Sequence, residues 1–186
     1  IEGQSVYLGV GDPNLYLASQ EKITDIDYYS KVTKLRSIFR GGIIEGDKIK
    51  EIYGPVDGSS EEIKTVANYL KPLKSTILLG DDANETNLKE MEMSQFKIIH
   101  FATHGEISGA LEGLNEPFLV LTPPDEASEA NDGLLTMTEI MALNTNADLV
   151  VLSACNTAAG DMPGTEGFSG LAKSFFISGS KSILVS

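Results

Sequence analysis

The chain has few of the features that mark secreted, membrane-spanning or nucleic-acid-binding proteins. Its 186 residues include one cysteine, Cys155, which cannot form an internal disulfide, and no charged-then-apolar leader opens the chain. Both absences favour a reducing, cytoplasmic compartment, and no apolar run approaches the roughly 18 residues of a membrane span. With 14 basic and 27 acidic side chains, the net charge of −13 makes DNA or RNA an unfavourable partner. The sequence therefore predicts a soluble cytoplasmic protein.

Short apolar runs alternate with helical patterns along most of the chain. Buried strands are predicted at 6–10, 76–80, 98–102, 117–121, 149–152 and 182–185. Helices are predicted at 28–39, 59–70, 84–93, 136–143 and 171–176. This alternation indicates an α/β fold, with a mainly parallel sheet and helices on both faces.

The length of the chain suits one domain spanning residues 1–186. Residues 18–58 have a mixed pattern and are predicted as an insertion in that domain. Because Ile1 is not an initiator methionine and the chain stops inside a predicted strand at Ser186, we expect it to be part of a longer protein.

Two of the predicted strands lead into residues that can carry chemistry. The run at 98–102 leads into His104, and the run at 149–152 leads into Cys155, about 50 residues later, which is the order and spacing found in caspases. Parallel sheets place their reactive groups at the carboxyl ends of strands, where backbone amides can stabilise a thiolate. The amide of Gly105, together with that of Cys155, would form an oxyanion hole for acyl transfer.

Other interpretations of these residues are open. A lone cysteine is often a small buried apolar residue, and His100 inside the strand is predicted as a buried histidine with satisfied hydrogen bonds. His100 and His104 have zinc-ligand spacing for a helix, but in a strand they lie roughly 13 Å apart and could not share a metal. The start of a dinucleotide-binding loop at Gly9 and Gly11 lacks the third glycine, and 11–14 is predicted as a turn. We expect no cofactor and no metal.

Several blocks in a fixed order resemble the CHAT domain family of caspase-like cysteine peptidases, which are distantly related to caspases and separase. The main blocks are 98–105, 132–136, 148–157 and 166–167, supported by 11–13, 61–63 and 79–88. The resemblance implies a caspase-like three-layer α/β fold. It also implies that Cys155 is the nucleophile, that His104 transfers the proton and that Gly105 donates an oxyanion-hole amide.

The resemblance implies a cysteine endopeptidase that cleaves a chosen protein after activation. Such domains commonly sit beside tetratricopeptide or other recognition modules in bacteria. Asp161 and Glu166 follow the nucleophile and either line a pocket for a basic substrate side chain or belong to an ordinary acidic loop. The alternative function is a catalytically silent interaction or scaffold domain. Calcium regulation is a further alternative, but no spaced calcium-binding loop supports it.

Overall fold

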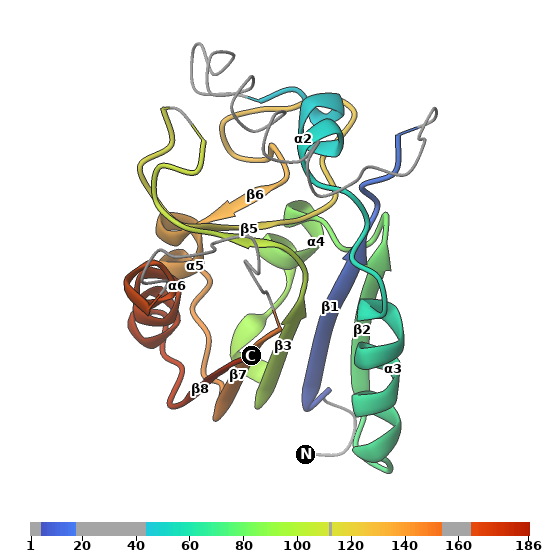
Figure 1. Cartoon of the computed structure of the whole chain (residues 1–186). Helices are drawn as coiled ribbons and strands as arrows, with labels where there is room; N and C mark the ends of the chain where they lie inside the picture. Colours follow the sequence, from blue (N-terminus) through green and yellow to red (C-terminus); the bar gives the residue numbers. More distant parts are fainter. Residues whose placement is uncertain (1–4, 18–43, 112, 154–164) are drawn as a thin grey trace.

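The computed structural model, which describes residues 5–17, 44–111, 113–153 and 165–186, is built around a parallel sheet (Figure 1). Within those residues the sheet has five strands in the order β2-β1-β3-β7-β8, and every neighbouring pair is parallel. The strands are β1 Tyr7–Pro13, β2 Ser75–Gly80, β3 Ile98–Ala102, β7 Leu149–Ser153 and β8 Ile183–Val185. The predicted α/β class with a mainly parallel sheet is confirmed.

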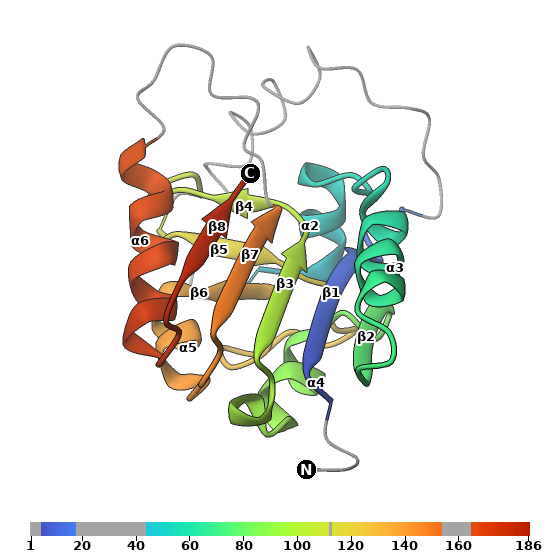
Figure 2. The same cartoon turned by 90° about the horizontal axis from the view of Figure 1, so that it is seen from below.

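Helices cover both faces of the sheet, as predicted. Helix α3 (Ser59–Tyr69) lies in front of β1 and β2 in Figure 2. The other face packs against α4 (Glu85–Glu90), the short helix η1 (Met93–Gln95), α5 (Met137–Ala142) and α6 (Thr165–Ile177). Because side chains alternate along a strand, Ile99 and Phe101 of β3 face this second layer, where the Phe101 and Phe175 rings are 5.6 Å apart.

Two glycines allow α3 to lie close against β1. A Cβ atom on Gly9 would be 2.6 Å from Cγ2 of Ile63, and one on Gly11 would be 3.0 Å from its Cγ1. Glycine at these positions therefore permits helix packing, which explains the pattern that resembles the start of a dinucleotide loop. The predicted turn at 11–14 is wrong in part, because pairing with β2 carries β1 through Pro13.

A second, antiparallel sheet lies beyond the carboxyl edge of the first. Its order in the described residues is β4-β5-β6, with β4 at Gly105–Glu106, β5 at Phe118–Val120 and β6 at Leu134–Thr136. Strand β5 is buried on both sides: Leu119 faces the main core, and Phe118 and Val120 face a second core. That double burial explains why its sequence reads like a strand of a parallel sheet.

The second core is completed by α2 (Gly46–Ile52), a helix that the sequence did not predict. Ile49 and Ile52 of α2, with Tyr53 just after it, are buried against Phe118 and its neighbours. The later part of the segment predicted as an insertion therefore packs into the domain. The helix predicted at 28–39 lies outside the described residues. In the part of the chain that is described, no helix has the length and apolar character needed to cross a membrane.

Candidate active site

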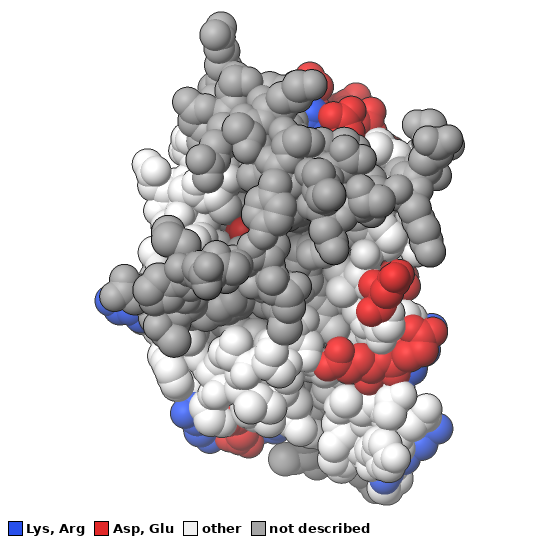
Figure 3. Space-filling view, viewed as in Figure 1, with Lys and Arg blue, Asp and Glu red and all other residues white. Residues whose placement is uncertain are grey.

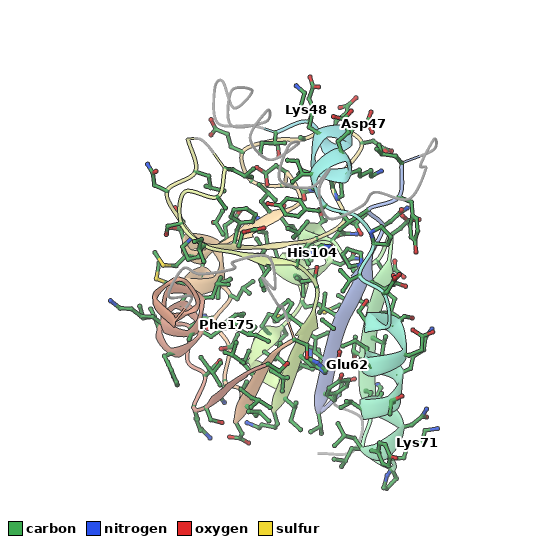
Figure 4. The ribbon with its side chains drawn as sticks, viewed as in Figure 1. Asp47, Lys48, Glu62, Lys71, His104 and Phe175 are labelled. Carbon is green, nitrogen blue, oxygen red and sulfur yellow. The ribbon has the colours of Figure 1, made fainter. Side chains whose placement is uncertain are left out.

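His104 lies in the short connection between the parallel sheet and the small antiparallel one. Strand β3 ends at Ala102 and β4 begins at Gly105. The Thr103 hydroxyl donates a hydrogen bond to the carbonyl of Val120, and the Val120 amide donates to the His104 carbonyl at 2.9 Å. These two bonds anchor the connection to β5. His104 is thereby held at the carboxyl edge of β3, below α2 in Figure 4.

The imidazole ring of His104 is oriented by the residues that follow α2. Its Nε2 atom lies 2.8 Å from the carbonyl oxygen of Gly54. The Tyr53 ring packs beside it, with centroids 5.6 Å apart and planes tilted by 38°, and is itself held edge-on against Phe118. Because a carbonyl oxygen only accepts hydrogen bonds, Nε2 carries the proton. In the neutral ring the lone pair is then on Nδ1, which can accept a proton.

Burial sets the protonation state of this ring. Removal of water lowers the pKa of His104 below its ordinary value of 6.5, and the hydrogen bond to Gly54 offsets part of that decrease. At neutral pH the ring is therefore uncharged. An uncharged, oriented imidazole is the state that a general base requires.

The strand register brings the ends of β3 and β7 together. Ala102 of β3 pairs with Ser153 of β7. His104 and Cys155 each follow one of these paired residues by two positions, a span of at most about 7 Å along the chain. Cys155 and Asp161 lie outside the described residues. The side chain of Glu166, near the start of α6, also lies outside them.

His100 and His104 have different surroundings. His100 is in β3, 2% exposed, and bonds to the Tyr7 hydroxyl and the Glu62 carboxylate, so the prediction of a buried, hydrogen-bonded histidine is confirmed. His104 bonds instead to Gly54. Among the described residues, no group of three or more histidine, cysteine, aspartate or glutamate side chains is arranged to hold a metal ion.

Sequence reasoning missed the groups that surround the two histidines. Gly54 acts through its backbone carbonyl, which has no side-chain signature. Tyr53 and Glu62 lie far from the histidine strand in the sequence, and nothing in their local pattern connects them to it. They contact the histidines only in the folded structure. The only local signal is the Gly54-Pro55 pair, which is typical of a turn that ends a helix.

Charged side chains are unevenly distributed over the described part of the face in Figure 3, which is otherwise mostly uncharged. In Figure 3, acidic side chains gather over the upper part of α3 and around α2, and basic side chains lie mainly near the opposite end of the molecule. Acidic side chains at this end favour cationic groups over polyanions.

A parallel sheet with helices on both faces, and a histidine oriented at the carboxyl end of a central strand, fit a caspase-like α/β domain. The chain belongs to the CHAT domain family, whose model matches residues 2–186. A search of curated proteins found no match. The CHAT family consists of caspase-like, peptidase-related domains. Membership of this family makes peptidase-type chemistry the one to consider at His104.

Proposed function

We propose that this domain is a cysteine endopeptidase that cleaves a protein substrate with a His104/Cys155 dyad. The observation that carries the proposal is the hydrogen bond from Nε2 of His104 to the Gly54 carbonyl, because it leaves Nδ1 as the proton-accepting atom. The register of Ala102 with Ser153 supports the pairing, since each catalytic candidate follows one of these residues by two positions.

The reaction proceeds in two steps. Nδ1 of His104 takes the thiol proton while the Cys155 sulfur bonds to the scissile carbonyl carbon. The C–N bond then breaks, and His104 returns the proton to the departing amine. A water molecule attacks the resulting thioester, which releases the new carboxyl terminus and regenerates the thiol. The amides of Gly105 and Cys155 stabilise the oxyanion in both steps.

Substrate choice is proposed to depend on charge. Asp161 and Glu166 follow the nucleophile along the chain and would bind a basic side chain next to the scissile bond. The acidic side chains over the upper part of α3 and around α2 in Figure 3 support a cationic substrate. The protein substrate would be delivered in the cytoplasm by a tetratricopeptide or other recognition module that also acts as the activator.

Thiol labelling tests the dyad directly, because the chain has one cysteine. The full chain is treated with a peptide-type electrophile across pH, beside His104→Ala and a Cys155→Ser blank. We expect rapid labelling with an apparent pKa below the free-thiol value of about 8.5, and labelling about 100-fold slower in His104→Ala. Equal, slow labelling of the parent and His104→Ala, with both proteins folded and the candidate activator present, would favour the silent scaffold domain.

The pocket is tested with two electrophiles that differ only in the residue before the reactive carbonyl. Arginine there should react faster than its neutral isostere citrulline, and Asp161→Asn with Glu166→Gln should remove that preference. Glu61→Gln, a charge change at an exposed position of α3, is the control and should keep that preference. A preference unaffected by the paired substitution would assign these two residues to an ordinary acidic loop.

A further inference from the structure

A carboxylate on α3 connects the helix to the end of β7. The Oε1 atom of Glu62 accepts hydrogen bonds from the Ser153 hydroxyl at 2.6 Å and from Nε2 of His100 at 3.1 Å. Figure 4 shows Glu62 reaching from α3 towards the strands. One carboxylate oxygen therefore binds both β3 and β7, on the sheet face that α3 covers.

The hydrogen bonds around His100 are mutually consistent. Because Glu62 accepts from Nε2, that nitrogen carries the proton, and Nδ1 accepts from the Tyr7 hydroxyl at 3.0 Å. Burial lowers the pKa of His100 and raises that of Tyr7, so both are uncharged at neutral pH. The Glu62 carboxylate supplies the charge, and hydrogen bonds to a charged acceptor are stronger than neutral ones.

This link is not required to hold the strands together. The backbone pairing already joins β1 to β3 and β3 to β7 along their length. His100 lies in the middle of that pairing, but Ser153 is the last residue of β7. The side chain of Ser153 is thus fixed where the ladder ends, two residues before Cys155. A small change in the direction of the chain at this point changes the position of the thiol.

We propose that Glu62 is a positioning residue for Cys155. Its carboxylate binds both Ser153 and His100, and thereby directs the chain as it leaves β7 so that the thiol can reach Nδ1 of His104 and the oxyanion-hole amides. The inference rests on the proposed peptidase function. It assigns to α3 a role in positioning the nucleophile, although α3 lies far from His104 and Cys155 in the sequence.

The experiment compares labelling rates of Cys155 in the full chain and in Glu62→Gln, Ser153→Ala and Ser153→Thr, each with His104 intact and with His104→Ala. Glu61→Gln is the matched control, since it makes the same charge change one residue away, at a position that is exposed as Glu62 is. With His104 intact, Glu62→Gln and Ser153→Ala should slow the peptide-type electrophile by about 10- to 100-fold, the scale of a misplaced reacting group. Ser153→Thr keeps the hydroxyl and should restore the parent rate.

The His104→Ala background separates positioning from general destabilisation. If Glu62 acts by presenting the thiol to His104, Glu62→Gln has little further effect once His104 is absent. Equal slowing in both backgrounds, or a parent-like rate in Glu62→Gln, overturns the positioning role. A parent protein whose labelling does not depend on His104 overturns the proposed function itself. Melting temperatures establish that each compared variant is folded.

Discussion

The Nε2 atom of His104 donates a hydrogen bond to the carbonyl oxygen of Gly54, 2.8 Å away. Gly54 belongs to the segment after α2, about 50 residues earlier in the chain. The segment predicted as an insertion at 18–58 therefore contributes, through its later part, to the surroundings of the candidate catalytic histidine. The bond determines which ring nitrogen can accept a proton, and burial determines the pH range in which it does so.

The acid limb of the pH profile should report this burial. Protonated His104 cannot take the thiol proton, and its pKa lies below 6.5 because water is removed from the ring. We expect kcat/KM to fall with a midpoint below pH 6.5. Tyr53→Ala exposes the ring to water, and should move the midpoint upward towards 6.5. A folded Tyr53→Ala protein with an unchanged acid limb would contradict the assignment.

Close packing of α3 on β1 predicts a non-additive pair of substitutions. Gly9→Ala places a methyl group 2.6 Å from Cγ2 of Ile63 and should lower the free energy of unfolding by about 1–3 kcal/mol. Ile63→Ala alone should cost about 2–5 kcal/mol. Together they should cost less than their sum, measured by urea unfolding. Gly54→Ala, whose new methyl group meets no atom within 4 Å, should leave stability near the parent value.

Glu85 should matter more for stability than an exposed ion pair. Its side chain is 0% exposed, lies 2.7 Å from Nζ of Lys89 and accepts the amides of Asp132 and Gly133. Glu85→Ala leaves the amides of Asp132 and Gly133 without their acceptor and should cost about 1–3 kcal/mol of unfolding free energy for each amide left unsatisfied. Lys181→Ala breaks a similarly short but exposed pair with Asp148 and should leave the urea midpoint almost unchanged. Similar losses for both would contradict the burial argument.

Asp132 should make the domain less stable as the pH rises. Burial raises the pKa of its carboxyl from 3.8 to about 7. Between these values the folded state binds more protons than the unfolded state, so this group's contribution to stability falls with pH and stays low above 7. Asp132→Asn remains neutral and keeps the oxygen that accepts the Leu134 amide at 2.9 Å.

We therefore expect the melting temperature of Asp132→Asn to match that of the parent near pH 4 and to exceed it at pH 8. The expected increase is about 2–4 °C for each kcal/mol of unfolding free energy gained. Asp125→Asn, on an exposed residue of the neighbouring loop, serves as the control and should show no such pH-dependent gain. A constant difference between Asp132→Asn and the parent across pH would exclude titration of Asp132 as the cause.

The sequence by itself determined the strands of the parallel sheet and the placement of His104 at the end of one of them. The spacing of apolar residues and the amino-acid composition are local properties. Strands β3 and β7 and the capped helix α5 could therefore be predicted from short stretches of sequence. The resemblance to the CHAT family also lies in the sequence, and the family model, which matches residues 2–186, confirms that membership.

Only the tertiary structure decided which groups meet the histidines. A backbone carbonyl such as that of Gly54 has no sequence signature, and Glu62 reaches His100 and Ser153 because helix α3 packs on glycines in β1. The sequence indicated that strand β5 is buried, but not which strands pair with it. Burial on both sides gives the same apolar pattern in a parallel and in an antiparallel sheet. Contacts between distant segments depend on the whole fold, and short-range patterns do not contain them.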